Sequence, residues 1–399
     1  MSEGATHVAR RAVASARVHA FTESVIREMT RLCMAHGAVN LAQGFPDFAA
    51  PEAVKEAARE AIAADVNQYA ITWGAKAFRE AIASKVARTY GWAVDPEREL
   101  TVTCGATEAM IASILAVVDP GEEIVAFEPF YENYGPDAIL AGAGVRFVPL
   151  RPPDWSFDRE QLAAALGPKT RGIVLNTPNN PTGKVFSREE LQAIADLAIA
   201  RDLVVFSDEI YEHILYEGTH VPIATLPGMA ERTVTINALS KTYSVTGWRV
   251  GWAIASPELT SAIRKVHDFL TVGAAAPLQA AGAVALGLPK SYYEDLALHY
   301  RERRDLLVGA LQEAGLACTA PAGAYYVLAD ITGLTDEDDA TFARRLVADP
   351  GVGAVPGSSF WRPGAPEGKR LIRFAFPKKL ETLRAAAERL VRVRVARPR

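Results

Sequence analysis

The sequence predicts an α/β protein with a mostly parallel sheet, followed by a smaller α+β unit. In the middle of the 399-residue chain, short apolar runs alternate with segments whose apolar residues recur at helical spacing. Such alternation is typical of parallel strands that are buried on both faces. The C-terminal part instead combines a long helical segment with two separated apolar runs. Because a chain of 399 residues is too long for one simple hydrophobic core, we expect two domains.

The expected elements follow from these runs. Six buried strands are expected in the central sheet, at 100–103, 124–127, 145–150, 172–175, 203–206 and 233–236. The helix 187–200 opens with Ser187 and Glu190 at capping-box spacing, and another begins at Ser256-Pro257. The C-terminal part is expected to hold a helix at 292–313, strands at 324–329 and 371–376, and a last helix. We therefore place a large domain at 50–290 and a smaller one at 1–49 with 291–399.

Composition narrows the class of protein. With 49% hydrophobic residues, 23% charged residues and a net charge of −4, the chain is globular, and nothing favours nucleic acid or an anionic membrane as a partner. Three cysteines without CxxC spacing predict buried thiols rather than disulfides or a metal site. The first twenty residues contain no continuous apolar segment, so we expect no secretory signal and a cytoplasmic protein. The apolar stretch 269–288 contains Pro277 and glycines, which favours a buried helix over a membrane span.

A lysine and an arginine follow the last expected strand of the sheet. Lys241 lies near the carboxyl end of that strand, where ligands bind in open α/β sheets. A lysine there can form an imine with an aldehyde cofactor and, once displaced, move a proton. Arg249 lies between Gly247 and Gly251, and its planar fork suits a phosphate group. Together these residues indicate a site for a phosphorylated aldehyde.

Polar groups follow three other strands. Asp208 ends one of them, and a carboxylate there can pair with a protonated ring nitrogen. The turn 176–183, rich in Asn and Pro, follows a second strand. Gly105 and the residues after it open a helix, whose free N–H groups can bind phosphate. Arg373 interrupts an apolar C-terminal strand, and a buried arginine requires an anion, either a substrate carboxylate or a structural ion pair.

These motifs resemble those of the class I/II aminotransferases, which are pyridoxal-phosphate (PLP) enzymes of fold type I, and several of them appear along the chain in the family's order. The resemblance covers about residues 20–390, and the segment 40–47 is closest to the kynurenine/glutamine/methionine-type branch. It implies a large PLP domain with a seven-stranded-type sheet. It also implies cofactor contacts by Lys241, Asp208 at the pyridinium, Tyr211 and Asn180 at the 3-oxygen, Tyr131 on the ring face, and Gly105, Ala106, Thr107 and Arg249 at the phosphate.

Further roles follow from the same resemblance. Arg373 and Asn180 would orient the substrate carboxylate, and Gly44 would let the backbone approach the substrate. Tyr69 matches a tyrosine that reaches the phosphate of the neighbouring subunit, which implies a homodimer with shared active sites. Ile26 occupies a position that is often aromatic in that branch. Ala238 stands where a phosphate-binding serine is common, so Arg249 and backbone N–H groups are expected to hold more of the phosphate.

The predicted reaction is the exchange of an amino group between an L-α-amino acid and a 2-oxo acid by a ping-pong mechanism. Lys241, as a free amine, would remove the Cα proton. A β-lyase acting on cysteine conjugates, alone or as a second activity, is the nearest alternative. A PLP-sensing regulator is more remote, because only about 20 residues precede the resemblance and they show no helix-turn-helix pattern. No clear second arginine is apparent for a distal carboxylate, which argues against strict aspartate specificity.

Overall fold

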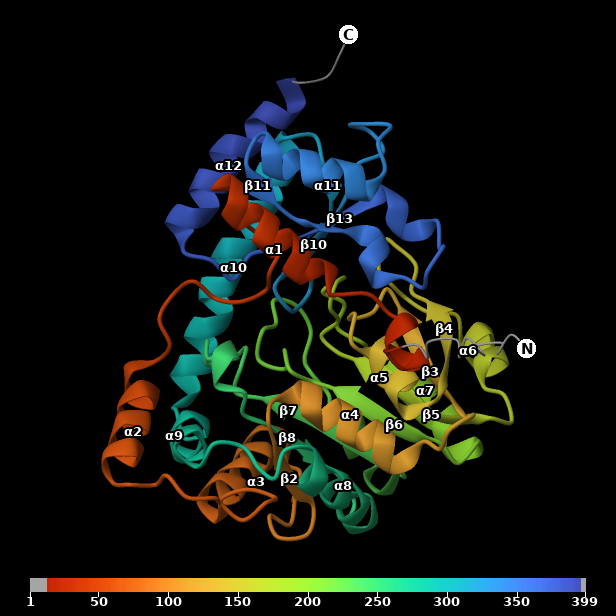
Figure 1. Cartoon of the computed structure of the whole chain (residues 1–399), viewed down its shortest axis with the longest axis vertical. Coiled ribbons are helices and arrows are strands. Elements are labelled where there is room, and N and C mark those ends of the chain that lie inside the picture. The colour runs from red at the N-terminus through yellow and green to blue at the C-terminus, as the bar shows by residue number, and fades with distance from the viewer. Residues whose placement is uncertain (1–12, 396–399) are drawn as a thin grey trace, which may run out of the picture.

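The computed structural model describes residues 13–395. Residues 1–12, on which part of the prediction about a secretory signal depends, lie outside the described residues. The described chain forms a large sheet from its middle part and a smaller sheet from its C-terminal part (Figure 1).

The large sheet confirms the predicted α/β class. Its seven strands have the order β2-β8-β7-β6-β5-β3-β4. Their bounds are β2 (Leu100–Thr103), β3 (Glu123–Glu128), β4 (Gly144–Pro149), β5 (Thr170–Asn176), β6 (Val204–Asp208), β7 (Thr233–Ala238) and β8 (Gly251–Ile254). The neighbours from β7 to β4 are parallel, whereas β8 runs antiparallel to both β2 and β7. The short strand β8 was not predicted, although residues 250–255 form an apolar run.

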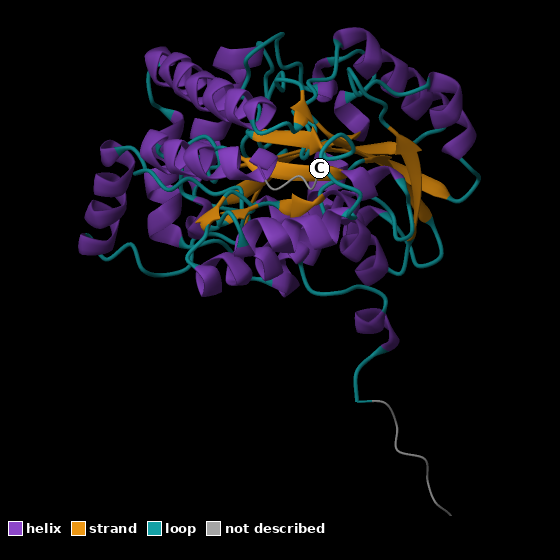
Figure 2. Ribbon diagram, turned by 90° about the horizontal axis from the view of Figure 1, so that it is seen from above, coloured by secondary structure: helices purple, strands orange, loops and turns teal. Residues whose placement is uncertain are grey.

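Helices cover both faces of this sheet (Figure 2). Neighbouring strand residues face opposite sides, so Ile124 packs in the cluster beneath α4, α5 and α8, while Val125 packs in the cluster beneath α6 and α7. The strand β2 and the helices α3 and α9 share a third cluster. The helices of this part are α2 (Glu52–Ala63), α3 (Lys76–Tyr90), α4 (Ala106–Val117), α5 (Tyr134–Ala141), α6 (Arg159–Ala165), α7 (Arg188–Ala200), α8 (Pro257–Leu270) and α9 (Ala276–Leu286). The predicted capping box of Ser187 and Glu190 opens α7.

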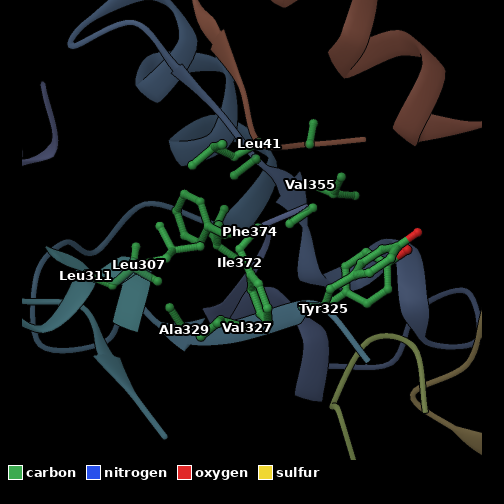
Figure 3. Close-up of a cluster of buried hydrophobic side chains, with 14 of the residues drawn as sticks. Leu41, Leu307, Leu311, Tyr325, Val327, Ala329, Val355, Ile372 and Phe374 are labelled. Atoms are coloured by element: carbon green, nitrogen blue, oxygen red, sulfur yellow. The ribbon is translucent and has the colours of Figure 1, made fainter. Parts of the chain in front are cut away.

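The smaller part is built from both ends of the chain. A four-stranded antiparallel sheet has the order β12-β13-β10-β9, and β1 pairs with β11 in parallel. The elements are α1 (Val25–His36), β1 (Val39–Asn40), α10 (Lys290–Glu313), β9 (Ala317–Cys318), β10 (Tyr326–Asp330), α11 (Asp339–Ala348), β11 (Val352–Gly353), β12 (Val355–Pro356), β13 (Leu371–Ala375) and α12 (Leu380–Val395). Figure 3 shows the shared core, in which Leu41 from the N-terminal segment joins Leu307, Ile372 and Phe374. The domain bounds given above remain a prediction.

The apolar stretch 269–288 differs from the expected single buried helix. Helix α8 ends at Leu270 and helix α9 begins only at Ala276, and Phe269, near the end of α8, is 91% exposed. Leu270 and Val272 are exposed as well. Within residues 13–395, no helix combines the length and apolar character needed to cross a membrane. All three cysteines are free, but only Cys33 is fully buried, so the expectation of three buried thiols is wrong for Cys104 and Cys318.

Candidate active site

A cavity of about 160 Å³ lies where β5, β6 and β7 end. Parallel strands bring their carboxyl ends to one edge of a sheet, so polar residues that follow different strands converge there. Asn180, Asp208 and Lys241 do so, and all three line the cavity. The opposite wall comes from the smaller part of the chain and includes Arg373 and Tyr326. The cavity is therefore formed jointly by the two sheets and the N-terminal segment.

Lys241 is held with its amine inside this cavity. The Nζ atom donates to the carbonyl oxygen of Gly44 over 3.4 Å. Burial, together with the nearby cations Arg249 and Arg373, lowers the pKa of this lysine to about 8, while Asp208 opposes the shift. A neutral amine is consequently accessible near neutral pH, which is the form that can attack a carbonyl or accept a proton.

Asp208 is buried at the end of β6. Its Oδ2 accepts a hydrogen bond from the hydroxyl of Tyr134 over 2.8 Å, and its Oδ1 accepts one from the backbone N–H of Ile210 over 3.3 Å. Burial raises the pKa of Asp208 to about 6, and the bond from Tyr134 limits this rise. Each carboxylate oxygen keeps acceptor capacity, so a protonated ring nitrogen would complete the set.

Arg373 is 1% exposed and has no acidic partner among residues 13–395. Its Nη1 donates to Oδ1 of Asn180 over 3.0 Å, and its Nη2 donates to the carbonyl of Ala42 over 2.7 Å. The Nε atom is buried without a hydrogen-bond partner. The rings of Tyr326 and Phe360 lie 4.4 and 4.6 Å from the guanidinium carbon. The alternative of a structural ion pair is absent within those residues, and an anion in the cavity would satisfy the charge.

Arg249 and the start of α4 form the other end of the cavity. Arg249 has a left-handed backbone with φ 54°, and its Nη2 donates to the hydroxyl of Thr107 over 3.4 Å. Gly105 precedes α4 with φ 85°, and a Cβ at this position would collide with the Arg249 guanidinium. Gly105 thus lies beneath the arginine rather than in the cavity lining, which contains Ala106 and Thr107.

The structure adds Ser240 to this end of the cavity. Ala238 is buried and does not line the cavity, whereas Ser240, next to the lysine, does. Ser240 therefore adds a residue with a hydroxyl group to the lining that also contains Arg249 and Ala106. The sequence reading gave Ser240 no role, because the position of a side chain in the turn after β7 depends on the turn geometry.

Three tyrosines surround the lysine. The Tyr211 hydroxyl lies 2.9 Å from the Tyr326 hydroxyl, and the Tyr325 hydroxyl donates to the carbonyl of Gly44 over 2.8 Å. A Cβ at Gly44 would collide with Tyr326. Glycine is therefore required at this position for packing, in addition to the predicted approach of the backbone to the substrate. Sequence reasoning missed Tyr325 and Tyr326, although the pair lies in the expected strand 324–329.

The remaining predicted residues divide into two groups. Tyr131 and Ile26 line the cavity. Tyr69 does not line it and is 87% exposed in this chain. Arg27, which was not predicted from the sequence, also lines the cavity, so a cation besides Arg249 and Arg373 is present there.

Comparisons with known proteins agree with this site. The family described as Aminotransferase class I and II matches residues 36–390. The chain is 41% identical over 384 residues to a probable N-succinyldiaminopimelate aminotransferase of Mycobacterium tuberculosis, covering 94% of this chain and 97% of that protein. It is 39% identical over 368 residues to the methionine aminotransferase of Escherichia coli, covering 92% and 95%. A mouse kynurenine–oxoglutarate transaminase is 38% identical over 401 residues, covering 93% and 88%. The solved N-succinyldiaminopimelate aminotransferase from M. tuberculosis matches with a TM-score of 0.93, covering 95% of this chain and 100% of that one.

The fold, the buried lysine and the carboxylate at the strand ends define a PLP enzyme of fold type I. The chain belongs to the class I and II aminotransferases. It transfers an amino group between an amino acid and a 2-oxo acid by a ping-pong mechanism, as the sequence predicted.

Proposed function

We propose that the cavity residues perform three tasks, which are binding the substrate carboxylate, holding the PLP ring and moving a proton. The observation that carries the proposal is the buried Arg373, which has no acidic partner among residues 13–395. Arg373, which is buried without an acidic partner among residues 13–395, binds the α-carboxylate, and Asn180 holds the arginine in place through its Oδ1. When bound, PLP supplies an aldehyde for the lysine and a ring that accepts electrons from Cα. Asp208, as a carboxylate, would pair with the ring nitrogen, and Tyr211 would donate a hydrogen bond to the ring oxygen. Lys241, as a neutral amine, takes the proton from Cα.

The phosphate group would lie against the start of α4. Arg249 supplies a charge, Thr107 and Ser240 supply hydroxyls, and the first N–H groups of α4 point toward the same space. This set includes three kinds of donor (guanidinium, hydroxyl and backbone N–H) without a serine at position 238. The proposal is tested by adding PLP to the apo protein and recording the visible absorbance, for the wild type and for Lys241→Ala. Absorbance that is present in the wild type, absent in Lys241→Ala, bleached by amino acids and restored by 2-oxo acids is expected. Equal absorbance in both proteins would contradict the assignment of the lysine.

The substrate side chain is the next part of the proposal. The three relatives above are named for succinyldiaminopimelate, methionine and kynurenine, so the family match leaves the side chain open. The cavity lining offers Ile26 and Met110 as apolar surface and Arg27 as a cation. Arg27 makes no ion pair or side-chain hydrogen bond with the described residues, whereas Arg31 on the same helix pairs with Glu23. We infer a substrate with an aliphatic chain that ends in an anionic group.

Arg27→Met tests this inference, with Arg31→Met as the matched control. Arg31 lies one turn after Arg27 along α1 and does not line the cavity. We expect kcat/KM for 2-aminoadipate and for N-succinyldiaminopimelate to fall about fivefold in Arg27→Met, as for the loss of about 1 kcal/mol from a partly exposed charge pair. The value for methionine should not change. Equal losses for methionine, or none for the anionic substrates, would reject the role of Arg27.

We also propose a homodimer in which Tyr69 reaches the partner's site. The supporting observation is an apolar patch on the residues around Tyr69 and Phe269, which are 87% and 91% exposed. The other exposed apolar residues of the two segments are Val66, Ile71, Leu270 and Val272. The segments touch, since His267 on α8 bonds the carbonyl of Thr72. Sedimentation should give a dimer for the wild type and a weakened dimer with low activity for Phe269→Glu. A fully active monomer would contradict the shared site.

Two predictions from the sequence stay open. The β-lyase alternative would show as pyruvate and ammonia released from cysteine conjugates without a 2-oxo acid. The cytoplasmic location also stays a prediction.

A further inference from the structure

A buried histidine outside the cavity has hydrogen-bond acceptors on both ring nitrogens. His267, on α8, is completely buried. Its Nδ1 lies 2.7 Å from Oε1 of Glu108, and its Nε2 lies 2.8 Å from the carbonyl oxygen of Thr72. A carbonyl oxygen can only accept, so Nε2 carries a proton. The state of Nδ1 depends on whether Glu108 is ionised.

Glu108 receives several donors besides the histidine. Its Oε1 accepts from the hydroxyl of Thr271 over 2.7 Å, and its Oε2 accepts from the backbone N–H of Cys104 over 2.5 Å. Burial opposes ionisation, but the bonds from His267, Thr271 and Cys104 lower the pKa of Glu108 below its ordinary value. Burial also opposes a charge on His267, yet the contact with Glu108 raises the pKa of the ring. An ionised Glu108 therefore faces a ring that donates from both nitrogens.

This pair joins two segments that belong to different parts of the phosphate site. Glu108 lies in the first turn of α4, directly after Ala106 and Thr107, which line the cavity. Thr72 lies in the segment that carries Tyr69, three positions earlier in the sequence. The side chain of His267 is thus bonded on one nitrogen to the phosphate-binding turn and on the other to the Tyr69 segment.

We propose that His267 is a positioning residue that fixes the phosphate-binding turn of its own subunit and the Tyr69 segment that this subunit lends to its partner. The inference rests on the proposed dimer and on the proposed phosphate contacts. It adds that each subunit sets part of both phosphate sites through one side chain. Loss of the histidine should weaken binding of the phosphate group at both sites, while contacts to the rest of the cofactor remain.

A comparison of PLP with pyridoxal, which lacks the phosphate, isolates this effect. We expect His267→Gln to raise the Kd for PLP at least tenfold and that for pyridoxal less than threefold. His220→Gln is the matched control, because His220 is also buried and bonds a buried carboxylate, Glu209, over 2.7 Å, away from the phosphate end. It should leave the ratio of the two Kd values unchanged. Equal losses for both ligands in His267→Gln, or an equal change of the ratio in both variants, would mean a general structural role and overturn the proposal.

A milder variant covers the case in which His267→Gln does not fold. Thr271→Val removes only the hydroxyl that donates to Glu108, in a residue of nearly the same shape. We expect it to raise the Kd for PLP several-fold relative to pyridoxal. A ratio that stays at the wild-type value would contradict the importance of the Glu108 contacts.

Mixed dimers test the link between subunits. One subunit carries Lys241→Ala, so that only its partner forms the visible imine, and this marked subunit has either His267 or Gln at position 267. We expect the intact site of the partner to bind PLP more weakly when the marked subunit carries His267→Gln. An unchanged intact site would refute the link through Tyr69. A wild-type protein that is monomeric or binds no PLP would instead reject the proposed function itself.

Discussion

Replacing Arg373 by methionine separates binding of the substrate carboxylate from folding. The guanidinium has five N–H donors, of which one on Nη1 and one on Nη2 bond Asn180 and Ala42. The buried Nε is unpartnered, and no acid pairs with the charge among residues 13–395. The arginine lines the cavity. We therefore expect its remaining donors to make two charge-assisted hydrogen bonds with the carboxylate of an incoming amino acid.

The magnitude follows from these bonds. Each hydrogen bond to a charged group contributes about 1.5–3 kcal/mol, so losing two costs about 3–6 kcal/mol, which corresponds to a ~10²- to 10⁴-fold drop in kcat/KM. Stability should respond differently. Methionine leaves the Asn180 and Ala42 oxygens without this donor, which destabilises the fold, but it also removes a buried charge without an acidic partner, which stabilises it. We expect the free energy of unfolding to change by about 1 kcal/mol or less.

The assay measures kcat/KM for several amino acids together with urea unfolding of the apo protein. Amines that lack a carboxylate provide the control, because their slow reaction should not depend on Arg373. The reasoning fails if activity and stability fall together, since that would identify Arg373 as a structural residue. It also fails if kcat/KM for amino acids stays within threefold of the wild type.

Three further predictions concern the lysine and its surroundings. Because the pKa of Lys241 is lowered to about 8, the rate at which apo protein gains visible absorbance with PLP should rise with pH through about 8; a rate independent of pH would contradict the assigned shift. Tyr134→Phe removes a bond that lowers the pKa of Asp208, so this pKa should rise above about 6 and the acid limb of the kcat/KM profile should move to higher pH; an unmoved limb would disprove the contact's role. Gly44→Ala places a Cβ against Tyr326 and should cost about 1–3 kcal/mol of stability by overpacking, measured by thermal unfolding, and lower activity at least tenfold.

The strand ends could be predicted because their signals are local. A parallel strand buried on both faces leaves a continuous apolar run, and the residue that follows the run lies at the edge where ligands bind. Asp208 ends β6 and Lys241 follows β7 closely, so the runs placed both residues at that edge, and the resemblance to the aminotransferases supplied their roles. Arg373 was found because a charge inside an apolar strand is conspicuous.

The residues that the sequence did not reveal depend on packing between distant segments. Tyr134 resembles any core aromatic until α5 lies over the sheet and brings its hydroxyl to Asp208, 74 positions away. Arg27 reaches the cavity only because helix α1 packs beside the cavity. Ser24, which precedes this helix, donates a hydrogen bond to Glu132, 108 positions away in the sequence. Such contacts are set by tertiary structure, and no local pattern in a single sequence encodes them.

The parallel pairing of β1 with β11 has a consequence for the order in which the enzyme forms on the ribosome. Val39 pairs with Val352, which is synthesised 313 residues later (352 − 39). The strands of the large sheet all lie between residues 100 and 254 and can pair before that point. A nascent chain therefore carries Asp208 and Lys241 on a folded sheet while β1 still lacks its partner strand β11. Arg373, the residue proposed to bind the substrate carboxylate, is synthesised after the other site residues, so an unfinished chain would hold an aldehyde but could not orient an amino acid.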